Sequence, residues 1–318
     1  MKAASISGVC RLLGISRQKY YRGVWGEAEC RERATWTVSM VKGIRERMPR
    51  IGTRKIHHMP GRELKKIGIG RDCLFGILRA NHMLITTYKS YHVTTNSHHR
   101  FRKHRNLVAG LEIVRPEQVW VSDITYIGSR SANMYLSLVT DAYSKKIVGY
   151  NLSQSLDTES SLKALRMANA SRRYPKETPI HHSDRGIQYC SDTYQRLLRR
   201  YGIKTSMTES YDPYANAVAE RVNGILKQEF LLEEMNLPFK LMRKVISECV
   251  YIYNNQRPHL SCGYNTPEWM HSQRDVAIKT YKRKPPQKTA AVNYDLLFLP
   301  CKTCNGYLGI VKDVSCFD

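Results

Sequence analysis

Three consecutive segments in the middle of the chain decide its expected fold: VWVSDITYIG at residues 119–128, MYLSLVTDAYS at 134–144 and KIVGYNLS at 146–153. Each segment is rich in β-branched and aromatic residues, and turn-forming residues separate one from the next. This composition is typical of consecutive antiparallel strands. We therefore expect a meander of three strands.

Helices and strands alternate after the meander. The pattern predicts a helix over 158–170 with Thr158 as its cap, a buried strand over 179–184, a helix over 192–200, a strand over 203–208 and a long helix over 216–232. A meander followed by alternating helices and strands indicates a mixed α/β sheet of the ribonuclease-H-like type.

The excess positive charge lies mostly before this sheet. The 318 residues include 51 Lys and Arg against 27 Asp and Glu, a net charge of +24. Residues 1–115 hold 24 basic and seven acidic residues, whereas residues 116–275 hold 20 and 17. Basic surfaces bind nucleic acids in a salt-dependent way, because binding releases counterions. The distribution favours a nucleic-acid-binding region joined to a nearly neutral domain, and the alternative is a solvated basic surface without a specific partner.

The first residues have the outline of a helix-turn-helix motif. Apolar residues recur at helical spacing over 6–13, Gly14 interrupts the pattern, and Ser16 is suited to cap a second short helix carrying Arg17 and Lys19. In such motifs the second helix enters the major groove of DNA. Helical hairpins that do not bind DNA share this outline.

A second helical unit is expected further along the basic region. A longer helix over 36–48 is followed by helical patterns near 52–59 and 70–83. The basic run HHRFRKHR at 98–105 has no apolar periodicity, so it is either a linker along a DNA backbone or a solvated tether. The side chains expected to contact DNA are Arg17, Lys19, Arg54, Lys55, Arg102, Lys103 and Arg105.

Three acidic residues stand where the predicted sheet would gather them. Asp123 lies in the first strand, Asp184 ends the strand that reads HHSD, and Glu220 lies on the long helix; the intervening stretches are 60 and 35 residues. Carboxylates that leave coordination positions open suit Mg²⁺ or Mn²⁺. Two such ions roughly 4 Å apart support phosphoryl transfer. Lys227 follows Glu220 by seven residues, about two helical turns, and could hold a phosphate.

The alternative for any single acid is a cap, a turn or a solvated face. We assign that alternative to Asp141, Asp192, Asp212 and Glu229.

Four segments resemble the catalytic subunit of bacterial insertion-sequence transposases of the second-reading-frame (OrfB) type, whose core is related to retroviral integrases. They are WVSDITYI, HHSDRGIQYC, DPYANAVAERVNGILKQEF and YNNQRPHLSCGYNTPEWM, and the resemblance covers about residues 40–275. It implies an integrase-like DDE core in which Asp123, Asp184 and Glu220 bind divalent metal. It further implies an enzyme that binds the terminal inverted repeats of its element, nicks one strand to free a 3′-OH and transfers that end.

The chain departs from this family pattern at two places near the acids. Ile187 follows HSDRG where a small polar residue is usual, and Ala215 stands where many members have Asp. Neither is a position of the acidic triad, so we expect metal binding to be retained.

The sequence predicts four parts: a helix-turn-helix over 1–48, a second helical DNA-binding unit with a basic linker over 49–112, an integrase catalytic core over 113–275 and a basic tail over 276–318. The nine cysteines are scattered and are expected to be reduced thiols. Cys301 and Cys304 form a lone CxxC, which is too few ligands for structural zinc. No apolar run reaches about 18 residues, so a soluble, cytoplasmic protein is expected.

The resulting hypothesis is a DNA transposase that uses Mg²⁺ or Mn²⁺ and no nucleotide, because no GxxxxGK[ST] loop is present. Its expected partners are double-stranded DNA and further copies of itself, since two DNA ends must be held together. The resemblance also implies an upstream helix-turn-helix partner in some members. The alternatives are a catalytically silent, transposase-derived DNA-binding protein and a stand-alone ribonuclease-H-like nuclease.

Overall fold

The computed structural model describes residues 5–86, 103–128, 134–208, 217–274 and 276. The chain divides into one unit over residues 1–279 and another over 280–318, and every described residue belongs to the first. Of the sequence predictions, Arg102, Asp212, Ala215 and the basic tail after residue 276 lie outside the described residues. The predicted domain boundaries stay predictions.

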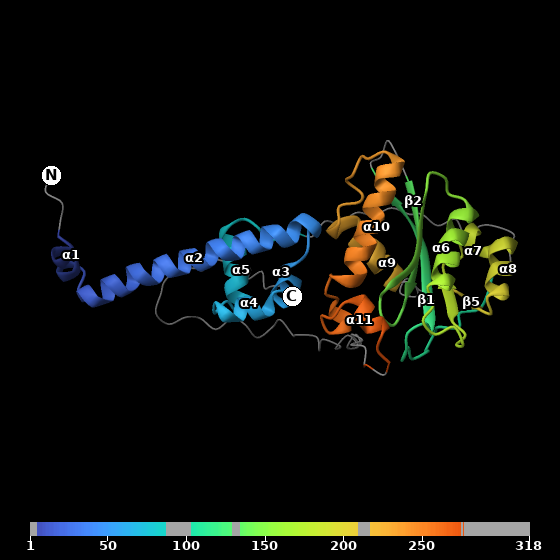
Figure 1. Cartoon of the computed structure of the whole chain (residues 1–318), viewed down its shortest axis with the longest axis horizontal. Helices are drawn as coiled ribbons and strands as arrows, with labels where there is room; N and C mark the ends of the chain where they lie inside the picture. Colours follow the sequence, from blue (N-terminus) through green and yellow to red (C-terminus); the bar gives the residue numbers. More distant parts are fainter. Residues whose placement is uncertain (1–4, 87–102, 129–133, 209–216, 275, 277–318) are drawn as a thin grey trace, which may run out of the picture. The chain divides into compact units, whose positions relative to one another are not determined.

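The expected meander is present, and two parallel strands extend it into a mixed sheet (Figure 1). The strands are β1 (Val119–Ile127), β2 (Met134–Asp141), β3 (Ile147–Ser153), β4 (Ile180–Ser183) and β5 (Lys204–Met207). Their order in the sheet is β3-β2-β1-β4-β5. β1, β2 and β3 pair antiparallel, whereas β4 pairs parallel to β1 and β5 pairs parallel to β4. The mixed α/β sheet predicted from the sequence is therefore confirmed.

Helices cover both faces of the sheet (Figure 1). One face carries α6 (Thr158–Ala170), α7 (Ile187–Cys190) and α8 (Asp192–Arg200). The other carries α9 (Ala217–Gly224), its continuation η1 (Ile225–Glu229) and α10 (Phe239–Asn255), and η2 (Leu260–Cys262) and α11 (Pro267–His271) follow. Alternate side chains of β2 serve the two faces, because Leu136 and Leu138 pack with α9 and α10 residues while Val139 packs with α6 and α8 residues.

Sheet and helix lie very close together where α6 crosses β3. A Cβ atom at Gly149 would lie 2.1 Å from the carbonyl oxygen of Ala164, so a side chain at this position would force the helix away. The glycine thus sets the distance between these two layers.

The basic amino-terminal region is helical, as predicted, but its first motif differs from the expected one. Its described helices are α1 (Ile6–Leu12), α2 (Arg17–Arg47), α3 (Thr53–His58), α4 (Gly61–Lys66) and α5 (Arg71–Ala80). Gly14 has a positive φ of 64°, and Ser16 caps the second helix through Lys19 N–H. That helix is not short: it runs for 31 residues and absorbs the separate helix expected over 36–48. A helix-turn-helix motif stays a prediction.

Two further expectations about helices were wrong. Asp157, rather than Thr158, caps α6, because its carboxylate accepts the Ser160 N–H at 3.0 Å. The single long helix expected over 216–232 is instead an α-helix that ends at Gly224 and continues as a π-helical turn, η1, to Glu229. Helix α10 was not anticipated.

Within the described part of the chain, no helix is both long enough and apolar enough to cross a bilayer.

Candidate active site

Asp123 and Asp184 adjoin each other where two parallel strands run side by side. β1 pairs with β4 in a register that places Ser122 opposite Ser183. Asp123 and Asp184 are the next residues along the two chains, and neighbouring strands lie roughly 4.8 Å apart. The parallel pair therefore brings together two acids separated by 60 residues of sequence.

Asp123 lies on the face of the sheet that α9 covers. Alternate residues of a strand share a face, so Asp123 shares its face with Val121, which packs with Ala219 of α9. From that helix, Asn223 donates its Nδ2 hydrogen to Oδ2 of Asp123 over 2.7 Å. Glu220 lies one helical turn before Asn223 and hence on the same side of α9.

The electrostatics of these acids reflect their mutual proximity. Burial and the negative charge of Asp184 raise the pKa of Asp123 to about 7, and the charge of Glu220 adds to the shift. Hydrogen bonds from Ile124 N–H and Asn223 oppose it. Burial also raises the pKa of Glu220. Asp184 and Glu220 are therefore close enough to Asp123 to disfavour its negative charge, which a cation would relieve.

The glycine of the HSDRG segment is explained by the Asp184 carboxylate. Gly186 N–H donates to Asp184 Oδ1 over 3.0 Å, and a Cβ atom at residue 186 would lie 3.0 Å from the same oxygen. A side chain there would push against the carboxylate. Gly186 thus orients Asp184 through the backbone.

The chemistry of this group of donors fits a divalent cation. Asp123, Asp184 and Glu220 supply hard carboxylate oxygens of the kind that Mg²⁺ and Mn²⁺ prefer. Among the described residues, the buried Oδ1 of Asn223 beside Asp123 has no hydrogen-bond partner. No three His, Cys, Asp or Glu side chains in the described ranges are already gathered as a ligand set. The acids therefore adjoin one another without closing on a common point.

The structure does not give Lys227 the spacing of two whole helical turns after Glu220 that the sequence predicted. Lys227 lies in η1, and because a π-helical turn is wider than an α-helical turn, seven residues no longer equal two whole turns after Glu220. Its amino group lies 3.7 Å from a carboxylate oxygen of Glu233. The side chain is 16% exposed and remains within reach of solvent.

The basic residues proposed for DNA binding fall into two groups. Arg17, Lys19, Arg54, Lys103 and Arg105 are exposed. Lys55 is instead mostly buried, and its Nζ lies 2.5 Å from Oε1 of Glu229. A side chain held in this way is a poor candidate for contact with DNA, so we remove Lys55 from the proposed contacts.

Glu229 overturns the prediction of a cap, a turn or a solvated face. Its carboxylate accepts two hydrogen bonds from Arg257, at 2.8 Å from Nε and 2.9 Å from Nη2. Arg257 itself is 1% exposed. Burial alone would raise the pKa of Glu229, but the hydrogen bonds and charges of Arg257 and Lys55 outweigh it and lower the pKa to about 2. The RPH segment was noted for its resemblance to the family, yet no pattern in it shows this pairing.

Two other acids match the structural roles expected for them. Asp141 is buried and stabilises a turn by accepting hydrogen bonds from the backbone and hydroxyl of Ser144 at 2.7 Å. Asp192 is an exposed residue of the first turn of α8, next to the cap Ser191.

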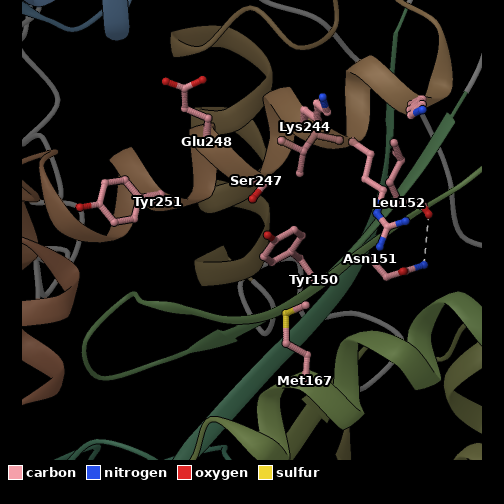
Figure 2. A pocket seen from close by; sticks show the side chains of 11 residues that line it. Tyr150, Asn151, Leu152, Met167, Lys244, Ser247, Glu248 and Tyr251 are labelled. Carbon is pink, nitrogen blue, oxygen red and sulfur yellow. Dashed lines mark hydrogen bonds between the residues drawn. The ribbon is translucent and has the colours of Figure 1, made fainter.

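A groove of about 750 Å³ lies away from these acids, between β3, α6 and α10 (Figure 2). Figure 2 shows Tyr150, Met167 and Ser247 around it. Exposed basic residues of α10 form part of its lining, namely Lys240, Arg243 and Lys244. None of the three candidate metal ligands lines this groove.

The part of the chain that forms the sheet matches family models of proteins with an integrase core. An integrase core domain family matches residues 114–213, and a second family with the same description matches residues 201–267. The ribonuclease-H-like fold class predicted from the sequence is thereby confirmed.

Relatives define the family more narrowly. The chain is 34% identical over 266 residues to the "Insertion element IS600 uncharacterized 31 kDa protein" of Shigella sonnei, a match that spans 81% of this chain and 96% of that protein. It is also 34% identical over 154 residues to "Transposase InsF for insertion sequence IS3A" of Escherichia coli K12, spanning 48% of this chain and 53% of that one, about half its length. The chain belongs to this family of insertion-sequence transposases, which serve DNA transposition.

Solved structures with a similar arrangement include retroviral integrases. The catalytic core domain of HTLV-2 integrase in complex with magnesium is 20% identical, with a TM-score of 0.40 and coverage of 52% of this chain and 99% of that one. A simian T-cell lymphotropic virus intasome chain is 20% identical, with a TM-score of 0.44 and coverage of 74% and 81%.

Proposed function

We propose that this protein binds the terminal inverted repeats of its insertion element, nicks one DNA strand to free a 3′-hydroxyl and joins that end to a new phosphodiester. The observation that carries the proposal is the grouping of Asp123, Asp184 and Glu220 on one face of the sheet, with the pKa of Asp123 raised by burial and by its acidic neighbours. Carboxylates arranged against their own repulsion are typical of a catalytic or metal site.

In this proposal Asp123, Asp184 and Glu220 hold Mg²⁺ or Mn²⁺. A divalent cation bound there supplies Lewis-acid stabilisation of the charge that develops at the attacked phosphate. Asn223 fixes the orientation of the Asp123 carboxylate through its 2.7 Å hydrogen bond, and Gly186 does the same for Asp184. Such outer contacts keep ligands in position for the reaction.

The two reactions balance without an energy source. In nicking, water attacks phosphorus and the 3′-oxygen leaves with a proton. In joining, the freed 3′-hydroxyl loses its proton and attacks a target phosphorus, and the target's own 3′-oxygen leaves and is protonated. One phosphodiester is formed for each one broken in the joining step, so no nucleotide is required.

The DNA is expected to lie along the basic residues that remain exposed. Arg17, Lys19, Arg54, Lys103 and Arg105 are the proposed phosphate contacts, together with Arg102 and Lys227. Because two DNA ends must be held together for joining, we further propose that several copies assemble on DNA. An upstream helix-turn-helix partner is an additional candidate component.

A nicking and joining assay tests the function. Oligonucleotides carrying the ends of the element are incubated with Mg²⁺ and wild-type protein, Asp184→Asn, or the control Asp192→Asn, whose carboxylate is exposed on α8. Asp184→Asn should lose several kcal/mol of charge stabilisation in the transition state. Its nicking rate should therefore fall by about a thousandfold or more. DNA binding and the control should be unaffected.

Nicking that survives in Asp184→Asn would show that the site is elsewhere. Salt-sensitive binding without nicking by any of the three proteins, with or without the upstream partner, would favour the catalytically silent DNA-binding protein instead.

A further inference from the structure

One carboxylate joins three segments that lie far apart in the sequence. Glu229 ends η1, Lys55 belongs to α3, and Arg257 follows α10. The two cations contact the same carboxylate, Lys55 at 2.5 Å and Arg257 at 2.8 and 2.9 Å. The backbone strengthens the junction, because Arg50 N–H donates to the carbonyl oxygen of Glu229 over 3.0 Å.

The charges of this cluster do not balance. Arg257 already pairs with both oxygens of Glu229, so Lys55 is a second buried cation on one anion. Burial and the positive charge of Arg257 lower the pKa of Lys55 to about 8, although Glu229 opposes the shift. A buried ion pair is stabilised by good geometry and a matching charge, and an additional cation adds desolvation cost. Stability of the fold alone therefore does not explain the presence of Lys55.

Apolar contacts also join α3 to η1, and an aromatic contact joins α3 to the segment after η2. Ile51 and Ile56, next to and within α3, belong to one buried cluster with Ile225 and Leu226 of η1. The ring of His58 stacks on Tyr264, with centroids 3.6 Å apart and planes 15° from parallel. The α3 segment is thus held against the π turn by an ionic and an apolar contact, and against the segment between η2 and α11 by a stacking contact.

The π turn that α3 contacts continues the helix that contains the candidate catalytic residue Glu220. η1 continues α9 without a break, and α9 contains Glu220 in its first turn. Lys227 lies two residues before Glu229. π turns within helices occur frequently at functional sites, and a metal ligand needs positioning to within about 0.5 Å. The seating of α3 therefore fixes the far end of the helix that presents Glu220.

We propose that Lys55 is a positioning residue that couples the basic helical region to the orientation of the Glu220 helix. The exposed Arg54, next to Lys55 on α3, is a proposed DNA contact. A movement of α3 on binding DNA would therefore change the position of η1 through the contact between Lys55 and Glu229. This inference rests on the proposed function for its catalytic consequence. The mechanical link between α3 and η1 is independent of that function.

The test compares Lys55→Met, Lys55→Arg and the control Lys66→Met in the full chain. Met keeps the side-chain stem and leaves the balanced pair of Glu229 with Arg257, so the variant should fold. Lys66 is an exposed lysine of α4, and its substitution removes the same charge from the same region. The nicking assay with Mg²⁺ gives kcat and KM for the DNA, and hydrogen exchange of the amides of residues 219–229 is measured without DNA.

Lys55→Met should lower kcat about tenfold with KM within roughly twofold of wild type, and should speed exchange in residues 219–229 about tenfold. Lys55→Arg should restore most of both. Lys66→Met should change neither kcat nor exchange.

A raised KM with unchanged kcat in Lys55→Met would show that Lys55 contacts DNA and would overturn the proposal. Unchanged exchange in that variant would overturn it as well, whatever the nicking rates. If wild-type protein does not nick at all, the proposed function fails, but faster exchange in Lys55→Met alone would still establish the link between α3 and η1.

Discussion

Two glutamates on one continuous helical segment show opposite electrostatic behaviour. Glu220 in α9 lies with two other acids, and burial raises its pKa. Glu229, nine residues further on in η1, is surrounded by Lys55 and Arg257, and its pKa falls to about 2. Both are carboxylates on the same element, so their chemical type does not explain the difference.

The comparison distinguishes an acid whose charge is balanced by cations of the protein from an acid that lies beside other acids. Glu229 receives its cations from the protein itself, and its negative charge contributes to holding three segments together. At Asp123, which accepts a hydrogen bond from Asn223 of the Glu220 helix, the neighbouring charges are negative instead. The structural acid and the candidate functional acid are thus distinguished by which charges the fold places beside them.

The largest expected effect on stability comes from Glu229→Gln. The change leaves Arg257 and Lys55 buried without a counter-charge, so the free energy of unfolding should fall by about 3–5 kcal/mol. Asp123→Asn should instead leave it unchanged or raise it, because one of the repelling acids is removed. Urea unfolding at pH 7.5 measures both, with Glu234→Gln, whose side chain is 61% exposed, as control. Equal losses of unfolding free energy in Glu229→Gln and Asp123→Asn would contradict the distinction between a structural and a candidate functional acid.

The second-largest effect is expected on DNA nicking, in the variant Asn223→Ala. Asn223→Ala removes the 2.7 Å hydrogen bond that orients Asp123, and should lower the nicking rate or the affinity for Mg²⁺ by about 10–100-fold. A Mg²⁺ titration of nicking distinguishes the two. The matched control is Asn255→Ala, an exposed asparagine of α10. Full activity in Asn223→Ala would mean that Asp123 does not depend on α9 for its orientation.

A smaller effect is expected in the pH dependence of stability. The ordinary pKa of Glu229 is 4.5 and its folded value is about 2, so the unfolded chain binds the extra proton between these values. The stabilisation is complete above pH 4.5 and is lost as the pH falls towards 2. Urea midpoints measured from pH 6 to pH 3 should fall less steeply in Glu229→Gln than in wild type. Parallel curves would argue against the low folded pKa.

The smallest expected effect comes from a neighbour of Lys55. Arg54→Ala should weaken DNA binding and reduce the slope of log affinity against log salt by about one, because one phosphate contact is lost. Stability should stay within about 0.5 kcal/mol, since Arg54 is exposed. The contrast between these adjacent residues is lost if Arg54→Ala, like Lys55→Met, lowers kcat without changing the salt slope.

Local patterns in the sequence were sufficient to predict the sheet and to place Asp123 and Asp184 on adjoining strands. The strands of the meander follow from β-branched and aromatic composition, and Asp123 and Asp184 were placed together by assuming that their strands adjoin. The structure pairs Ser122 with Ser183, directly before them. These features depend on short stretches of sequence and on one rule of topology.

Features that depend on distant or irregular contacts were not predictable in this way. Lys55 and Glu229 are 174 positions apart, and nothing local marks them as partners. Glycines at positions 23 and 26 lower the helix propensity of the segment that nevertheless forms α2. The π turn after Gly224 keeps an apolar spacing that also fits an α-helix, so the change of geometry is invisible to periodicity.

The position of Arg257 has a consequence for the timing of synthesis. A growing chain that has emerged as far as Glu220 already contains all three candidate metal ligands and Lys55, but Arg257, the second cationic partner of Glu229, is made 28 residues after Glu229 itself. The contacts of Arg257 with the π turn therefore cannot form until α10 has followed it out of the ribosome. A polypeptide that stops between these points contains every acid of the site without the arginine that fixes the end of its helix. If the proposed strand transfer depends on a fixed helix end, such shortened products should lack it.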